Sequence, residues 1–267
     1  MSAALSRQLV MTDRLGLTPE LVVESGGERP EPRYRFGVAR TLEEVIEAWS
    51  MVYRVYVHNR FIFPHAFGYH TSPHAIGSHA VVIAHHIGQR LISTLTAMRD
   101  TVLGLPLDSL YPEELDSLRR DGRVLTEAGL LADCGDERAT SIEALFALMN
   151  HSIAYAFVGD GTDLICGVHP RHARFYQKAY GFELIGDTRA YPAVNNRPCV
   201  LIRLAREVLT QSHRLPRGLV SLVAQKLDES DFLPRFPFGE EDQCLAEFDR
   251  YLNYREVGQV MSAMCAA

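Results

Sequence analysis

The stretch from Asp163 to Gly186, DLICGVHPRHARFYQKAYGFELIG, constrains the fold more than any other part of this 267-residue chain. Its apolar run from Leu164 to Val168 is short enough for a buried strand. Pro170 ends that strand, because proline cannot donate to a ladder and restrains the residue before it. Residues 171–179 then fit a helix, and Gly181 suits its left-handed C-terminal cap. Because a second short apolar run follows at once, the stretch predicts a strand–helix–strand unit.

Two amphipathic helices with capping boxes are predicted upstream of this unit. Thr41 with Glu44 begins one of them, and Thr140 with Glu143 begins the other. In the first helix the apolar positions follow the helical period closely; they are Leu42, Val45, Ile46, Trp49, Val52, Tyr53 and Tyr56. Further strands are expected at 34–39, 78–84, 90–98, 123–131 and 199–204, with a turn at 86–89 and a short helix at 112–120.

The pattern divides the chain into three parts. Residues 1–32 are expected to form a tail that ends in a glycine- and proline-containing linker. Residues 33–205 mix strands and helices, which indicates one α/β domain. Residues 206–267 carry only helical patterns, so we expect a helical C-terminal extension. With 47% hydrophobic and 22% charged residues, the composition is that of a globular protein.

Charge and composition exclude several functions. The formal net charge of −6 gives no basis for binding nucleic acid. No apolar run approaches the roughly 20 residues of a transmembrane helix, and the N-terminus does not resemble a signal peptide. Five scattered cysteines without C-x-x-C spacing fit reduced thiols, so a cytoplasmic location is expected. The histidines match no zinc motif, so neither a metal nor another cofactor is expected.

The strand–helix–strand unit contains the pattern A-x-F-Y-x-x-x-x-G-F, which resembles the last conserved segment of the GNAT acyltransferase superfamily. The matching residues are Ala173, Phe175, Tyr176, Gly181 and Phe182. This resemblance implies an α/β fold of the GNAT (acyl-CoA N-acyltransferase-like) type, in which a mixed central sheet is flanked by helices.

Five motifs in order narrow the resemblance to one family within that superfamily. They are Y-R-V-Y (53–56), G-L-P-L-D-x-L-Y-x-x-E-L-D-x-L-R (104–119), T-E-A-G-L-L-A (126–132), H-P-R-H-x-R-F-Y (169–176) and Y-P-A-V-N (191–195). Over residues 34–204 the chain resembles the long-chain N-acyl amino acid synthases of the FeeM type, relatives of the acyl-homoserine-lactone autoinducer synthases. The resemblance implies transfer of a fatty acyl group from acyl carrier protein to the amino group of an amino acid such as tyrosine.

Glu127 is the first catalytic candidate. Attack on a thioester needs an unprotonated amine, so a base or a proton-accepting water chain is useful. Apolar neighbours would raise the pKa of a glutamate in this strand. The resemblance also implies an acidic residue here, as in the E-x-S-R segment of the autoinducer synthases, although Ala128-Gly129 departs from that segment. Alternatively, Glu127 is a strand carboxylate that simply faces solvent.

The remaining catalytic candidates also follow from the resemblance. The tyrosine at position 176 would protonate the leaving thiolate, a task suited to a phenol, or it only packs its ring. The backbone N–H groups of Leu130 and Leu131 would polarise the thioester carbonyl if the strand bulges there, and Gly129 makes a bulge easier.

Substrate-binding candidates lie in the same motifs. Arg54 suits the carboxylate of an amino acid, although it is equally compatible with a surface charge. Arg171 and His172 follow a predicted strand end, a favourable place for ligands in α/β sheets. The family motifs add four further candidates, which are Tyr56, His169, Phe175 and Asn195.

The expected acyl donor is the phosphopantetheine thioester of acyl carrier protein rather than acyl-coenzyme A. The loop 133–141 lacks the paired glycines that hold a pyrophosphate in GNAT enzymes and carries carboxylates instead. Docking an acidic carrier protein needs a local basic face; candidates are Arg119, Arg120, Arg123, Arg171, Arg174 and Lys178. Two alternatives stay open: an ordinary coenzyme A-dependent N-acyltransferase and a non-catalytic protein that binds acyl groups or carrier protein.

Overall fold

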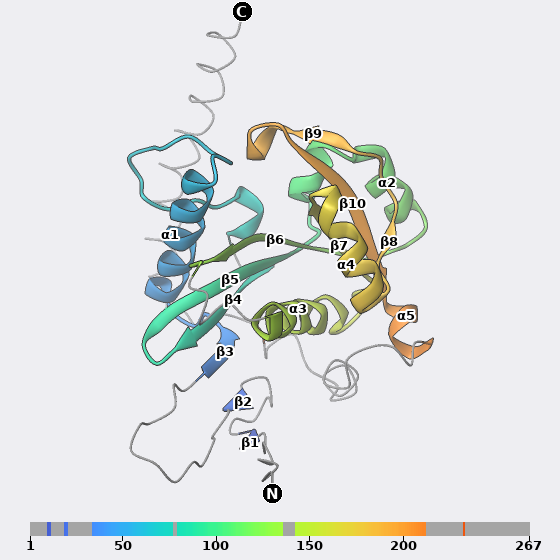
Figure 1. The fold of residues 1–267 in the computed structure, drawn as a ribbon. Coiled ribbons are helices and arrows are strands. Elements are labelled where there is room, and N and C mark those ends of the chain that lie inside the picture. The colour runs from blue at the N-terminus through green and yellow to red at the C-terminus, as the bar shows by residue number, and fades with distance from the viewer. Residues whose placement is uncertain are drawn as a thin grey trace, which may run out of the picture.

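A mixed eight-stranded sheet forms the centre of the computed structural model, which describes residues 10–11, 19–20, 34–76, 79–135, 142–211 and 232 (Figure 1). The strand order is β3-β4-β5-β6-β7-β10-β8, and β9 pairs with β10. The strands are β3 (Tyr34–Val38), β4 (Ala80–Ile87), β5 (Arg90–Arg99), β6 (Leu125–Asp133), β7 (Asp163–Val168), β8 (Glu183–Leu184), β9 (Arg189–Tyr191) and β10 (Arg197–Ala205). Neighbouring strands are antiparallel except for β6 and β7, which run parallel.

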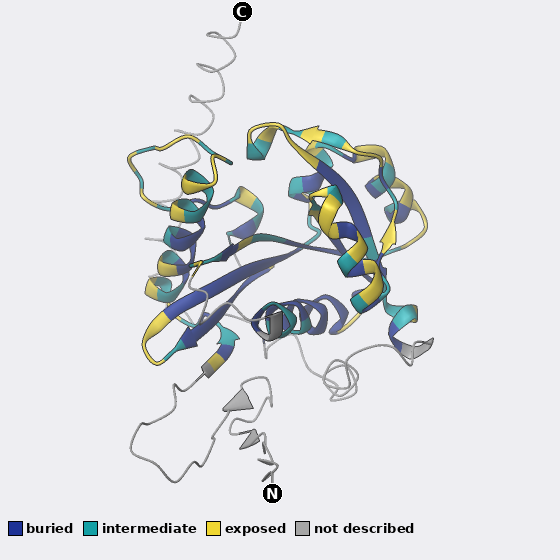
Figure 2. Ribbon diagram, in the orientation of Figure 1, coloured by how far each residue is buried: buried dark blue, intermediate teal, exposed yellow. Residues whose placement is uncertain are grey.

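Helices cover both faces of the sheet. They are α1 (Leu42–His58), α2 (Pro112–Arg120), α3 (Ile142–Phe157), α4 (Pro170–Tyr180) and α5 (Arg206–Gln211), with the 3₁₀ turns η1 (Pro73–Ala75), η2 (Pro106–Ser109) and η3 (Pro192–Val194). One face of β6 carries Ala128, which joins the core of α3 and α4. The opposite face carries Leu125, which joins the core of η2 and α2, while α1 also covers that face at β4 and β5. Figure 2 shows that burial is concentrated in the sheet and on the helix faces turned toward it.

The predicted strand–helix–strand unit is confirmed. The helix α4 begins after His169, whose Nδ1 accepts a hydrogen bond from the Arg171 backbone N–H at 3.3 Å. It ends at Gly181, which has φ = 82°, the left-handed cap that glycine adopts without strain. The strand that follows is shorter than expected, because only Glu183 and Leu184 pair with β10.

Two predictions about helix and turn boundaries are corrected. At the start of α1, Thr41 Oγ1 accepts from the Glu44 N–H as expected, but the Glu44 carboxylate accepts from the Arg40 N–H rather than returning to Thr41. The turn between β4 and β5 is shorter than the predicted 86–89. His86 and Ile87 remain in β4, because they pair with β3 as well as with β5. The second predicted capping box, at Thr140 and Glu143, lies outside the described residues.

Little of the predicted terminal parts falls within the described residues. Val10–Met11 (β1) and Pro19–Glu20 (β2) form a two-stranded sheet within the predicted tail. Behind the domain, α5 follows β10 directly, and Phe232 is fully buried against the Tyr155 ring. Cys134, Cys166 and Cys199 are free thiols. Within the described ranges no helix is long and apolar enough to cross a membrane, and no group of three or more potential ligands could hold a metal ion.

Candidate active site

The strands β6 and β7 separate in the middle of the sheet, and Glu127 stands where they do. Their parallel pairing joins Leu125, Thr126 and Glu127 of β6 to residues 163–165 of β7. Beyond that point β6 continues beside β5 and β7 continues beside β10, so the two strands diverge (Figure 1). We call the point of divergence the fork. Ligands of α/β sheets bind at such strand ends.

A β-bulge follows the fork in β6, as the predicted thioester-binding role requires. Thr94 of β5 pairs with Ala132 and Thr96 pairs with Gly129, so Leu130 and Leu131 both lie opposite a single residue of β5. Leu130 has φ = 50°, a left-handed conformation that is strained for leucine. The strain therefore falls on Leu130 rather than on Gly129, where the sequence suggested flexibility. Leu130 and Leu131 therefore have no regular partners in the β5–β6 ladder.

Glu127 is buried, with only 4% of its surface exposed. Its Oε2 accepts a hydrogen bond from the Leu107 backbone N–H at 2.9 Å. Burial raises the pKa of Glu127 to about 8; the Leu107 N–H opposes this rise, and the Asp108 and Asp100 carboxylates add to it. The alternative of a solvent-facing strand carboxylate is therefore wrong. A carboxylate whose pKa lies near the working pH is suited to accept and release a proton.

Gly129 places no side chain beside the Glu127 carboxylate. A Cβ at that position would lie 3.7 Å from Glu127 Oε1 and 3.4 Å from Met98 Cε. Thr96 pairs with Gly129 across the strands, and its buried hydroxyl has no hydrogen-bond partner among the described residues. Buried polar groups normally bind a partner. The Thr96 hydroxyl and Glu127 Oε1 therefore offer two polar atoms to a small group bound over Gly129.

Tyr176 lies on the other face of the sheet, in the core of α3 and α4. Its ring is buried edge-on against Phe182, with 5.8 Å between ring centroids. Burial raises the pKa of Tyr176, and the nearby Cys166 thiol adds to the rise. Cys166 in turn interacts with Glu127 and with the Ala128 backbone at the fork. Cys166 therefore interacts electrostatically with both predicted catalytic side chains.

The N-terminus of α4 brings three of the predicted binding residues together on the surface. His169, Arg171 and His172 are all exposed there. The Arg171 Nε–H donates to His172 Nε2 at 2.9 Å. Partial burial lowers the pKa of His172, and the adjacent Arg171 and His169 lower it further. This group follows the end of β7, as the sequence predicted.

The other predicted binding residues are dispersed. Arg54 is exposed on α1, and Tyr56 is half-buried between Phe61 and His70, with ring centroids 5.5 Å away in each case. Phe175 contacts Phe146 of α3 instead of joining the group at the N-terminus of α4. Asn195 has φ = 55° and donates from Nδ2 to the Arg60 carbonyl at 3.3 Å, which links the β9–β10 loop to the end of α1.

Sequence reasoning missed the contact that η2 makes with Glu127. The motif beginning G-L-P-L-D was noted for its resemblance, and only Arg119 at its end was given a role, as a candidate for the basic docking face. In the structure Gly104 has φ = 71°, and η2 follows with Leu107 fully buried. The available signal was the combination of a glycine, a proline at the start of a turn and an acidic residue three positions after Leu105.

The mixed sheet, the fork between two parallel strands and the bulge beside a buried glutamate define an N-acyltransferase of the GNAT fold. The sequence profile of the family described as "N-acyl amino acid synthase FeeM" matches residues 47–205. The chain therefore belongs to the FeeM family of N-acyl amino acid synthases, which are acyltransferases.

The solved structure of FeeM is consistent with this assignment, and two other solved structures show lower similarity. FeeM, an N-acyl amino acid synthase from uncultured soil microbes, has 26% sequence identity with the chain and a TM-score of 0.60; the match covers 68% of this chain and 96% of FeeM. The autoinducer (AHL) synthase LasI has 13% identity and a TM-score of 0.48 over 65% of this chain and 90% of LasI. Escherichia coli ElaA has 8% identity and a TM-score of 0.45 over 64% of this chain and 98% of ElaA. No curated protein matches the chain by sequence.

Proposed function

We propose that this synthase transfers a long-chain fatty acyl group from acyl carrier protein to the amino group of an amino acid with a tyrosine-like side chain. The observation that carries the proposal is the buried Glu127 at the fork, immediately before the β6 bulge. A base and a set of backbone donors on one strand fit attack of an amine on a thioester. The reaction takes place in the cytoplasm.

In the proposed mechanism the acceptor amine binds beside Glu127 Oε1, in the space left by Gly129. Ionised Glu127 accepts a proton from the amine, directly or through one water, as the nitrogen attacks the thioester carbonyl carbon. The backbone N–H groups of Leu130 and Leu131 stabilise the negative oxygen of the tetrahedral intermediate. The carbon–sulfur bond then breaks, the amide forms, and Tyr176 donates its proton to the departing thiolate.

Acyl carrier protein is the proposed donor because α4 presents a basic face. Arg171, Arg174 and Lys178 are exposed and spaced to lie along one side of α4, which contains no acidic residue. Two other predicted contributors do not belong to this face: Arg119 is paired with three aspartates, and Arg123 is paired with Asp163 and Glu207. An acidic carrier protein complements the α4 side chains. Most of the 133–141 loop lies outside the described residues.

A carboxylate-bearing acceptor is proposed on the basis of the family. Arg54 on α1 would bind that carboxylate, and the half-buried Tyr56 and Phe61 together with the buried His70 would contact an aromatic side chain. Because α1 packs over β5 and β6, these residues lie on the face of the sheet that carries Glu127.

Two experiments test the proposed function. The first is mass spectrometry of lipids from cells that overproduce the protein, in which new N-acyl amino acids are expected. Unchanged lipids would favour a non-catalytic binder. The second compares the purified enzyme with matched acyl chains on carrier protein and on coenzyme A. An equal or higher kcat/KM with the coenzyme A thioester would make the chain an ordinary coenzyme A-dependent acyltransferase.

A further inference from the structure

We propose that Arg119 is a positioning residue that sets the orientation and the proton affinity of Glu127. It does so by closing the loop between β5 and α2, so that the Leu107 N–H reaches the carboxylate. This inference rests on the proposed function only for its effect on catalysis, since the effect on Glu127 itself can be measured without substrate.

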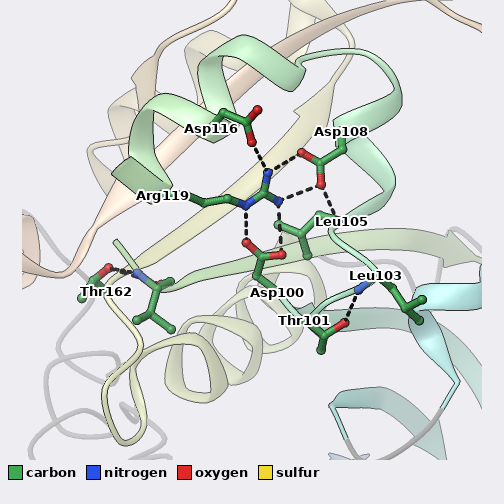
Figure 3. Close-up of polar contacts among 9 residues, drawn as sticks. Asp100, Thr101, Leu103, Leu105, Asp108, Asp116, Arg119 and Thr162 are labelled. Atoms are coloured by element: carbon green, nitrogen blue, oxygen red, sulfur yellow. Dashed lines mark hydrogen bonds and ion pairs between the residues drawn. The ribbon is translucent and has the colours of Figure 1, made fainter. Parts of the chain in front are cut away.

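One guanidinium binds both ends of this loop (Figure 3). Arg119 Nε and Nη2 donate to the two oxygens of Asp100, at 2.6 and 3.1 Å. Nη1 and Nη2 donate to the two oxygens of Asp108, each at 2.7 Å. Asp100 follows the end of β5, and Asp108 lies in η2. Two bidentate pairs on one planar group fix both distance and orientation, which a single ion pair does not.

Asp108, which Arg119 binds, also holds the 3₁₀ turn η2 in which it lies. Asp108 Oδ2 accepts the Leu105 N–H at 2.6 Å and so holds the start of η2 (Figure 3). A Cβ at Gly104 would lie 2.5 Å from the same oxygen, and Gly104 has φ = 71°. The site therefore requires glycine for both conformation and space. The motif residues Gly104, Asp108 and Arg119 together hold η2 in its conformation.

The position of the Leu107 N–H is fixed by contacts at both ends of the loop. The Leu107 side chain is buried in the core that also contains Leu125 and Ile165, next to the fork. At the other end of the loop the Asp100 N–H donates to the Leu125 carbonyl at 3.0 Å. Leu125 lies two residues before Glu127 on β6. Consequently the Leu107 N–H meets Glu127 Oε2 at 2.9 Å and leaves Oε1 turned toward Gly129.

Charge compensation gives Arg119 a second effect on Glu127. The Asp108 and Asp100 carboxylates raise the pKa of Glu127, whereas the Leu107 N–H lowers it. Arg119 neutralises both aspartates and also maintains the turn that presents the N–H. Burial would raise the pKa of Asp108, but hydrogen bonds from Arg119 and Leu105 outweigh burial and leave it below its ordinary value. Loss of Arg119 would remove both sources of stabilisation of the Glu127 anion.

The decisive measurement is the pKa of Glu127 itself. Protein labelled with ¹³C at glutamate Cδ is titrated by NMR, and the Glu127 signal is assigned by its loss in Glu127→Gln. In Arg119→Gln we expect the pKa of Glu127 to rise by about one or more. In Arg119→Lys, which keeps the charge but not the two bidentate pairs, a smaller rise is expected. Asp116→Asn is the control, because Asp116 is 56% exposed and contacts Arg119 from outside the loop; it should leave the pKa unchanged.

The outcomes separate positioning from general stabilisation. If Arg119→Gln does not fold, the pKa of Glu127 is titrated in Arg119→Lys alone. An unchanged pKa of Glu127 in folded variants of Arg119 would overturn the proposal, even if their melting temperatures fell. With an active enzyme, the acidic limb of kcat/KM should move in step with the NMR value. If the wild type forms no N-acyl amino acid, the proposed function fails, while the titration still decides the role of Arg119.

Discussion

The Leu107 backbone N–H and the Glu127 carboxylate, separated by 20 residues in sequence, form a hydrogen bond of 2.9 Å inside the fold. This contact leaves one carboxylate oxygen for chemistry, because Oε2 is used by the protein and Oε1 faces the space over Gly129. The first group of predictions therefore concerns Glu127.

Replacement of Glu127 by Gln should slow the chemical step by roughly 10²–10⁴-fold, because the amide cannot accept the proton of the amine. The shape of the side chain is preserved, so binding of the acyl donor should persist. Single-turnover kinetics and a separate donor-binding assay distinguish the two steps. Near-normal turnover in this variant would show that Glu127 is not the base.

The stability of the protein should depend on pH through Glu127. Because its pKa rises from 4.5 in the unfolded chain to about 8 in the fold, the folded state keeps a proton that the unfolded state has released. The resulting stabilisation is complete below the unfolded pKa and is lost as pH rises through the folded pKa. From about pH 5 to 8, wild type should therefore lose free energy of unfolding relative to Glu127→Gln, on the order of a few kcal/mol. Denaturant titrations of both proteins across this range measure the difference, and parallel curves would contradict it.

Tyr176→Phe should lower kcat and kcat/KM together, because the hydroxyl is proposed to act only when the thiolate departs. The ring stays in its contact with Phe182, so little loss of stability is expected. Tyr180→Phe, at another buried tyrosine of α4, is the matched control and should leave kcat unchanged. A change confined to KM in Tyr176→Phe would make this residue a binding group.

The left-handed backbone at Leu130 predicts an asymmetry between neighbouring residues. Leu130→Val should destabilise the protein by about 1–3 kcal/mol and reduce kcat, because a β-branched residue is poorly accommodated at φ = 50°. Leu131→Val is the control, since φ is not positive there and its side chain is 36% exposed. Equal effects of the two substitutions on melting temperature and kcat would argue against a catalytic bulge.

Charge reversal on α4 should affect the carrier-protein reaction selectively. In Arg174→Glu we expect kcat/KM with acyl carrier protein to fall at least about tenfold, with the reaction of a short acyl-pantetheine thioester unaffected. Arg90→Glu, at an exposed arginine of β5, is the control because it changes the net charge by the same amount. A similar loss with both donors would place the defect in the fold instead of in docking.

Local patterns predicted the fold well, because its elements are specified by short-range chemistry. The α4 unit needed only an apolar run, a proline and a glycine cap. By contrast, β9 was missed because Arg189–Tyr191 becomes a strand only through pairing with β10. The turn at 86–89 was misplaced for the same reason, since its boundary depends on pairing of His86 with β3.

The candidate site was predicted only in part, because much of it depends on backbone conformation and on contacts between residues that are far apart in the sequence. The apolar neighbours of Glu127 favoured its burial but left a solvent-facing carboxylate open, and the bulge was anticipated from the resemblance. The left-handed residue was not, because nothing in Leu130 itself favours that conformation. Arg119 of α2 binds one aspartate just after β5, one in η2 and one in α2, and no local pattern indicates that three aspartates share one guanidinium.

The short ladder between β6 and β7 has a consequence for how the enzyme accommodates its substrate. The sheet holds together there through the pairing of residues 125–127 with 163–165. Past Glu127, each strand keeps a partner on its outer side only, so the sheet contains two inward-facing edges within its own span. Main-chain groups along such edges are obligatory hydrogen-bonding groups. An extended substrate bound between the two strands would therefore meet main-chain groups that the β6–β7 ladder does not use.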